Sequence, residues 1–207
     1  MTVAKPAPFI NAADLNLLRG RQVHLEFLTP AHRNILRPLA RDERIWEFTK
    51  TLLITETYDQ QFDKYFDEAL SFAARGDQAF AIVAADGRVI GMTRAYDIDR
   101  KVKKVTIGHT WYVPKVWGKG HNKECKLLLL KYIFDILGLA RVDFKVASQN
   151  IRSQKAVATI GAVKEGVLRR FTLRNDGSPT DTVIFSILDD EWPESKRRLQ
   201  EMVAAFS

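Results

Sequence analysis

The 207-residue chain has very little cysteine and no long apolar segment. Its single cysteine, Cys125, cannot form an intrachain disulfide, so nothing in the sequence indicates secretion. The first ten residues lack the apolar region of a signal peptide, and the longest apolar run, residues 79–85, is far shorter than a membrane span. These absences lead us to expect a cytoplasmic protein that does not enter a membrane.

The sequence also lacks internal repeats, a second-domain linker and any His, Cys, Asp or Glu cluster with metal-ligand spacing, so no metal is expected. It does contain 46% hydrophobic and 28% charged residues, which is typical of a globular domain with its own core. We expect one domain at residues 21–207, preceded by an N-terminal extension at residues 1–20 that shows no periodicity.

The formal net charge is +7, which fits a nucleic acid, an acidic protein partner or a phosphorylated cofactor. The basic residues are spread along the chain, however, with only short clusters such as Lys101, Lys103 and Lys104. No predicted helix is lined with basic residues and interleaved aromatics. A solvated basic surface is therefore expected, and nucleic acid is not expected as a partner.

Hydrophobic periodicity predicts an alternation of strands and helices. The expected strands are residues 22–28, 79–84, 89–96, 104–113, 141–147, 162–173 and 180–187. The first expected helix begins at Pro30, and Pro38 should kink or shorten it. The other expected helices cover residues 58–74, 120–137, 150–160 and 191–205. Antiparallel hairpins combined with one β–α–β unit predict a single α/β (α+β) domain with a mixed, mostly antiparallel sheet.

Residues 115–120 leave a strand, pass through a turn that contains Gly118 and Gly120, and enter a helix. The N–H groups at a helix start have no partner within the helix, and together with the helix dipole they bind phosphate. The two glycines permit positive φ and a close approach of the ligand. Lys115, Lys119 and Lys123 add positive charge. A plain strand-to-helix turn is the alternative interpretation of this G-x-G pattern.

The pattern is neither a nucleotide triphosphatase loop nor a complete dinucleotide-binding G-x-G-x-x-G, because Lys123 replaces the third glycine. It resembles the pyrophosphate loop [QR]-x-x-G-x-[GA] of the GNAT superfamily of N-acetyltransferases, with Lys115 in place of Gln or Arg. The resemblance covers about residues 18–200. Within the superfamily, the chain resembles the ribosomal-protein-acetylating branch. The matching segments are residues 107–111, 122–130, 150–153, 161–166 and 191–193.

The resemblance implies a sheet that splays between two strands, with helices on both faces and the pantetheine arm of acetyl-CoA in the gap. It implies that backbone groups of residues 111–113 bind this arm and that one N–H polarises the thioester carbonyl. Gly108 is consistent with a bulge on the same strand. The implied cofactor-binding residues are Trp111, Tyr112, Val113, Lys115, Val116, Trp117, Gly118, Lys119, Gly120, His121, Asn122 and Asn150.

Asn150 has two interpretations, a helix N-cap and a side chain that binds the pantetheine, and both can hold. Ser153, one turn later, is implied by the resemblance to be the catalytic acid that protonates the departing thiolate. The alternative for Ser153 is a first-turn helix serine bonded to the backbone.

A general base is needed because an amine acceptor must lose a proton. Some relatives carry a glutamate shortly after the pair Glu165-Gly166, but this chain has no acid there. Alternation places His109 on one face with Val105, Ile107 and Trp111, which predicts a core histidine. Glu47 and Asp97 are weaker candidates for the base, and Cys125 is expected to pack inside the domain.

The sequence therefore predicts an acetyl-CoA-dependent N-acetyltransferase that transfers the acetyl group directly in a ternary complex, with no acyl-enzyme. The acceptor is a primary amine, and protein N-termini, lysines, small amines and aminoglycosides stay open. An acidic protein partner and a homodimer also stay open. The rival interpretation is a non-catalytic acyl-CoA-binding module that regulates a partner.

Overall fold

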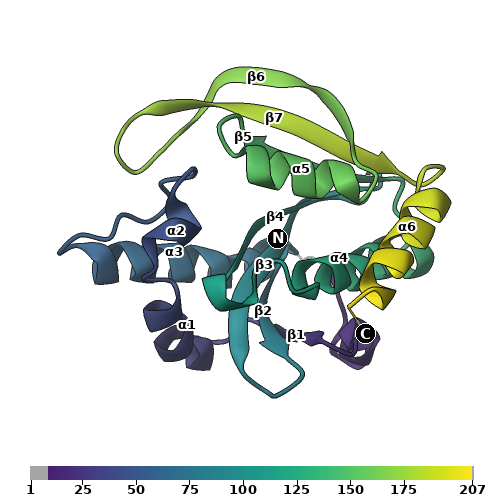
Figure 1. Ribbon diagram of the computed structural model, residues 1–207, viewed down its shortest axis with the longest axis horizontal. Coiled ribbons are helices and arrows are strands. Elements are labelled where there is room, and N and C mark those ends of the chain that lie inside the picture. The colour runs from purple at the N-terminus through teal and green to yellow at the C-terminus, as the bar shows by residue number, and fades with distance from the viewer. Residues whose placement is uncertain (1–8, 207) are drawn as a thin grey trace, which may run out of the picture.

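The computed structural model describes residues 9–206, which form an α/β fold around one seven-stranded sheet (Figure 1). The strand order across the sheet is β1-β2-β3-β4-β5-β7-β6. The strands are β1 (Val23–Phe27), β2 (Gln78–Ala84), β3 (Val89–Asp99), β4 (Lys104–Tyr112), β5 (Arg141–Ala147), β6 (Val163–Leu173) and β7 (Pro179–Leu188).

Only β4 and β5 run parallel; the other neighbouring pairs are antiparallel. The crossover between β4 and β5 carries α4, which is the predicted β–α–β unit. Turns at Gly87 and Gly177, both with positive φ, close the β2–β3 and β6–β7 hairpins. The prediction of a mixed, mostly antiparallel sheet is thus confirmed.

Helices cover both faces of the sheet and enclose two apolar cores (Figure 1). One core joins the sheet to α4, α5 and α6, and the other joins it to α1, α2 and α3. The helices are α1 (Arg33–Leu39), α2 (Glu43–Trp46), α3 (Tyr58–Ser71), α4 (His121–Lys131), α5 (Ile151–Thr159) and α6 (Trp192–Ala204). Shorter 3-10 segments lie at Ala12–Leu18, Pro30–His32, Phe72–Arg75 and Pro114–Val116, and a π-helix lies at Tyr132–Ile136.

The N-terminal extension is not a free tail over its described part. Phe9, Ile10 and Leu18 are at most 2% exposed, and Asp14 accepts a hydrogen bond from the Tyr132 hydroxyl at 2.8 Å. The segment lacks a regular period because it forms a 3-10 helix whose few apolar residues fill the edge of the core. Residues 1–8 lie outside the described residues.

One helix prediction needed correction, and one short helix was missed. The predicted helix at residues 120–137 changes to a π-helix after Lys131, so its α-helical part is shorter. The α2 helix was missed because its single turn is too short to show a period. Pro38 lies inside the last turn of α1, which ends one residue later, as expected.

The interpretation of His109 as a core residue is wrong. The pairing of β3 with β4 shifts between Met92 and Arg94, so that Gly108 and Trp111 enclose a bulge. His109 lies in this bulge with φ of 50° and an exposed side chain. The extra residue breaks the alternation on which the prediction rested. Consequently Trp111 packs in the core on the α3 side of the sheet, whereas Val105 and Ile107 pack on the α4 side.

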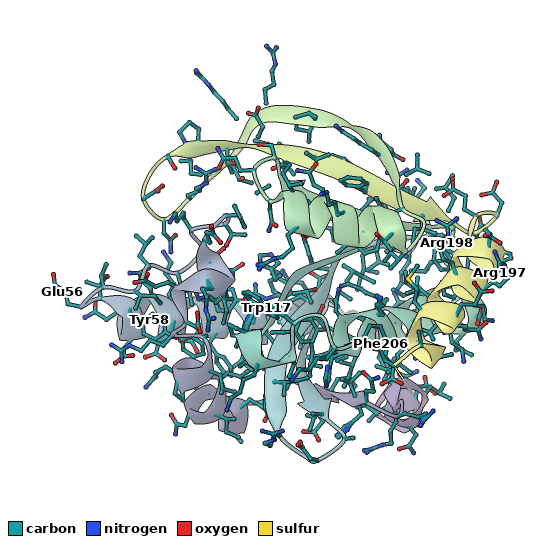
Figure 2. All side chains as sticks on the ribbon, viewed as in Figure 1. Glu56, Tyr58, Trp117, Arg197, Arg198 and Phe206 are labelled. Carbon is teal, nitrogen blue, oxygen red and sulfur yellow. The ribbon has the colours of Figure 1, made fainter. Side chains whose placement is uncertain are left out.

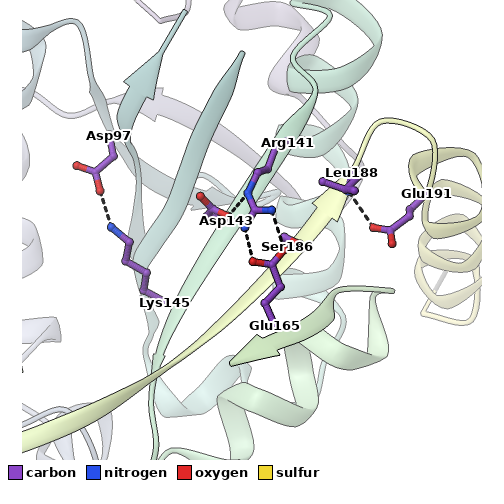
Figure 3. A network of polar contacts seen from close by, with 8 residues as sticks. All are labelled: Asp97, Arg141, Asp143, Lys145, Glu165, Ser186, Leu188 and Glu191. Atoms are coloured by element: carbon purple, nitrogen blue, oxygen red, sulfur yellow. Dashed lines mark hydrogen bonds and ion pairs between the residues drawn. The ribbon is translucent and has the colours of Figure 1, made fainter. Parts of the chain in front are cut away.

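An ionic network holds the last three strands together (Figure 3). Arg141 on β5 donates to Asp143 on the same strand at 2.7 Å and to both carboxylate oxygens of Glu165 on β6 at 2.6 Å. The Ser186 hydroxyl on β7 donates to Glu165 at 2.7 Å. Arg141 and Ser186 lower the pKa of Glu165 to about 2. The Glu165 carboxylate is therefore committed to structure.

Within residues 9–206, no helix is both long enough and apolar enough to pass through a bilayer. The same residues contain no group of three or more His, Cys, Asp or Glu side chains placed to hold a metal ion.

Candidate active site

The sheet opens between β4 and β5. These strands pair through three residues each, with Thr106 opposite Asp143 as the last pair, and then separate. Beyond this point β4 stays paired with β3 as far as Tyr112, and β5 stays paired with β7 as far as Ala147. The facing edges of β4 and β5 therefore carry backbone groups that lack a partner strand. This opening, which we call the splay, is where an extended ligand could bind as an additional strand.

The turn that follows β4 has the backbone predicted for a phosphate-binding loop. Gly118 has φ of 75° and Gly120 has φ of 88°, a conformation that favours glycine. A Cβ on Gly118 would meet nothing within 4 Å. A Cβ on Gly120 would lie 2.8 Å from the ring of Phe206 and 2.9 Å from Gln22. Gly118 thus borders open space, whereas Gly120 leaves room for the C-terminal segment.

Helix α4 begins directly after this turn, with Gly120 as its N-cap. Lys123 and Glu124 donate their N–H groups to the Gly120 carbonyl, so the N–H groups that precede them mark the open helix end. His121 and Asn122, both half-buried, occupy this first turn. Burial is the main cause that lowers the pKa of His121, which favours its neutral form.

The lysines of the loop differ in position. Lys115 and Lys119 are exposed and line a cavity of about 830 Å³ between the loop, the β2–β3 turn and the C-terminus, together with Arg21 and Arg88. The ammonium of Lys123 lies 4.6 Å from the centre of the Phe206 ring. All of these charges surround the loop, but Lys123 contacts the C-terminal segment.

The backbone of β4 presents a donor to the splay. Val113 donates its N–H to Ile90 on β3 at 2.9 Å. Successive peptide groups of a regular strand point to opposite edges, so the N–H of Tyr112, which follows the bulge, points toward the splay. The Tyr112 carbonyl accepts a hydrogen bond from the Trp117 indole at 2.9 Å, which anchors the loop to the strand.

Helix α5 begins beside the splay, after β5. The Asn150 side chain accepts the Ser153 N–H at 3.0 Å, so the N-cap prediction is confirmed. Among residues 9–206 the Ser153 hydroxyl has no hydrogen-bond partner, which argues against the backbone-bonded alternative. The half-buried Ser153 hydroxyl is therefore free to serve a ligand.

Arg152 was missed by sequence analysis, although it lies inside the recognised 150–153 segment. Its guanidinium lies 4.1 Å from the centre of the Trp117 ring and 6.0 Å from that of Phe48. Trp117 lies near the middle of the molecule in Figure 2, where the two apolar cores meet. Arg152 thus connects α5 with the glycine loop across the mouth of the splay. An arginine two residues after the Asn150 cap was the available signal.

Lys126 is a second residue that sequence analysis left without a role. It is 5% exposed and lies beneath the splay, where its ammonium donates to the Thr110 hydroxyl at 3.0 Å. The ammonium also lies 5.8 Å from the centre of the Phe144 ring on β5. Burial lowers the pKa of Lys126 to about 8. The sequence showed it only as one polar position in an apolar helix.

The candidate bases occupy different environments. The Asp97 carboxylate forms an ion pair with Lys145 at 2.6 Å, which joins β3 to β5 on the α3 side of β4. Glu47 is exposed at the C-cap of α2. His109 is the accessible candidate on the strand that borders the splay. Cys125 is fully buried, as expected for a packing residue.

Comparison with known proteins agrees with this architecture. The family model described as "Acetyltransferase (GNAT) domain" matches residues 22–163. The chain is 32% identical over 100 residues to an uncharacterized N-acetyltransferase, YoaA, of Bacillus subtilis; the match covers 48% of this chain and 55% of that protein. The chain thus spans little more than half the length of this curated relative.

Two solved structures share the fold. A GCN5-related N-acetyltransferase from Brucella melitensis superposes with a TM-score of 0.79 at 26% identity, covering 89% of this chain and 83% of the other. A spermidine N-acetyltransferase from Vibrio cholerae, in complex with CoA and spermine, has a TM-score of 0.67 at 20% identity, covering 84% and 99%. This chain belongs to the GNAT acetyltransferase family.

Proposed function

We propose that this protein is an acetyl-CoA-dependent N-acetyltransferase that transfers an acetyl group to a primary amine, directly and within a ternary complex. The observation that carries the proposal is the splay between β4 and β5, which opens beside a glycine turn and a helix N-terminus. An extended arm fits the splay, and a pyrophosphate fits the helix end.

Acetyl-CoA has a matching shape and charge. Its pyrophosphate would bind where Gly118 leaves space next to the first turn of α4. Its pantetheine arm would run from there along β4 toward the vertex of the splay, passing the N–H group of Tyr112. Arg152, on the other side of the mouth, adds a cation next to this path. The arm would therefore end with its thioester near the middle of β4.

The chemistry needs two further contributions. A backbone N–H on β4 would stabilise the oxyanion that forms when the amine attacks the thioester carbonyl. The Ser153 hydroxyl, free of other partners, would donate a proton to the departing thiolate of CoA. The C–N bond forms as the C–S bond breaks, so no group on the protein needs to carry the acetyl group.

The acceptor is a protein N-terminus, a lysine or a small amine. Resemblance to the ribosomal-protein-acetylating branch favours a protein N-terminus, and the net charge of +7 favours an acidic partner. We also propose a cytoplasmic location, because acetyl-CoA is consumed there. A homodimer fits the exposed apolar residues of the edge strand β6, which include Val167 and Phe171 at 45% and 50% exposure.

The proposal is tested by measuring release of free thiol from acetyl-CoA across a set of amines, including N-terminal peptides, lysine peptides, polyamines and aminoglycosides. Initial rates with both substrates varied should give intersecting double-reciprocal lines, as a ternary complex requires. Parallel lines would instead indicate an acyl-enzyme. Tight binding of acetyl-CoA without thiol release for any amine would favour the non-catalytic acyl-CoA-binding module.

A further inference from the structure

We propose that His109 is the general base of this protein, accepting the proton of the attacking amine directly or through one water. The inference rests on the proposed acetyl transfer and adds the residue that sequence analysis left unassigned. It starts from the bulge in β4, which removes His109 from the regular alternation of the strand.

The bulge gives His109 an unusual combination of position and freedom. It is exposed, whereas Val105, Ile107, Trp111 and Tyr112 on the same strand are at most 7% exposed. Its φ of 50° is costly for a residue with a Cβ, and such strain is found preferentially at functional sites. Among residues 9–206, its imidazole has no hydrogen-bond partner. Both ring nitrogens are thus available to a ligand or a water.

The imidazole lies at the splay, on the α3 side of the sheet. Its ring is 5.2 Å from that of Tyr96 on β3 and 6.5 Å from that of Tyr65 on α3, measured between ring centres. Lys145 on β5 extends across to the Tyr96 ring at 5.6 Å. His109 is therefore flanked from β3, from α3 and, across the splay, from β5.

His109 is also close to where the reaction would occur. It is three residues beyond Thr106, the last β4 residue paired with β5. His109 precedes Tyr112 by three residues and so lies on the vertex side of it. The thioester, at the inner end of the pantetheine arm, would lie in this interval. His109 would take the proton of the amine either directly or through one bridging water.

The surroundings of His109 keep its imidazole neutral at pH 7 and also make it a weaker base than a free imidazole. The residue keeps an exposed surface, but the groups packed around its ring desolvate it and lower its pKa to about 3, and the nearby cations Arg94 and Lys145 contribute to the same shift. The carboxylate of Asp97 is paired with Lys145, so it does not restore a high pKa. The imidazole is accordingly neutral near pH 7. A neutral imidazole suffices as the base, because the nitrogen of the attacking amine becomes more acidic once it has bonded to the carbonyl carbon of the thioester.

Other bases are less well placed. Asp97 and Glu165 are each held in ion pairs, with Lys145 and Arg141 respectively. In the transfer, the amine nitrogen bonds to the acetyl carbon, its proton passes to His109, and the electron pair of the C–S bond leaves with the thiolate. His109 then releases this proton to solvent, and Ser153 recovers from solvent the proton that it gave to the thiolate.

The positive φ of His109 and its exposure provide a sharp experiment. Glycine tolerates a φ of 50°, so His109→Gly keeps the bulge, and the space that it leaves is open to added imidazole. We expect kcat to fall about 100-fold or more, as for loss of a general base, with an unchanged Kd for acetyl-CoA. Added imidazole should raise the kcat of this variant at least about tenfold, and substituted imidazoles should raise it further as their basicity increases.

Two controls isolate the chemistry. Lys103→Gly also places glycine at an exposed position with positive φ, 58°, and should leave kcat unchanged with or without imidazole. His109→Gln should keep the acetyl-CoA Kd but show no rescue. Full kcat in His109→Gly, or a lowered kcat that no imidazole restores, would overturn the assignment. Absence of turnover in the wild-type protein with every amine would instead overturn the proposed function and this inference with it.

Discussion

The buried ammonium of Lys126 should make the protein less stable at neutral pH than a variant without it. Burial lowers the pKa of Lys126 from its ordinary value of 10.5 to about 8. A shift of this size lowers the free energy of unfolding by about 3 kcal/mol at pH 7, because the folded state keeps the buried group charged. Below pH 8 both states bind the proton and the cost is complete. As the pH rises from 8 to 10.5, only the unfolded state stays protonated, and the cost disappears.

Lys126→Met should therefore raise stability at pH 7. Methionine retains an unbranched apolar stem, and the variant loses the hydrogen bond to Thr110, which is worth about 1 kcal/mol. The expected net gain in the free energy of unfolding is about 2 kcal/mol at pH 7. The gain should shrink as the pH approaches 10.

Urea unfolding of both proteins at several pH values between 7 and 10 measures this difference. Taking the difference between variant and wild type cancels the titration of the tyrosines and other lysines. If the difference stays constant across this pH range, Lys126 does not titrate as a buried group and the reasoning fails. A variant that is less stable at pH 7 would show that the ammonium has stabilising partners that outweigh its burial.

Three further predictions concern the loop and the neighbouring helix. Gly120→Ala should lower the melting temperature more than Gly118→Ala, because only a Cβ at position 120 meets Phe206. Adding Phe206→Ala to Gly120→Ala should recover part of that loss. Equal losses for the two glycine variants would refute the packing argument. Asn150→Ala should cost about 1 kcal/mol in urea unfolding for the lost cap, and an unchanged midpoint would show that the cap is dispensable. Arg152→Gln should raise the acetyl-CoA Kd about tenfold, about 1.4 kcal/mol by calorimetry, and flatten its salt dependence, whereas an unchanged Kd would place Arg152 outside the cofactor path.

The elements that sequence analysis predicted well carry regular patterns. The strand alternations, the helix periods and the Asp86-Gly87 turn depend on neighbouring residues alone, so one sequence suffices to locate them. The positive φ values of Gly118 and Gly120 were likewise predictable from their position between a strand and a helix.

The features that escaped prediction depend on contacts between distant segments. Gly108 was consistent with a bulge on this strand, and the structure confirms one, but the displacement of His109 from the core face follows only from how β3 and β4 pair. Arg152 contacts Trp117 across 35 positions of the chain, and Lys126 reaches Thr110 across 16. These side chains come together only because β4 and β5 separate, which is a property of the assembled sheet.

The central claim is that acetyl-CoA bound in the splay gives its acetyl group directly to an amine. Its most direct test is to incubate the protein with acetyl-CoA that carries deuterium in the acetyl group, together with an amine that supports thiol release. The masses of the intact protein and of the amine are then measured. We predict label on the amine, one free CoA thiol for each labelled amine, and an unmodified protein at every time point. Label that accumulates on the protein before it reaches the amine, or acetyl-CoA that binds and never reacts, would contradict the account.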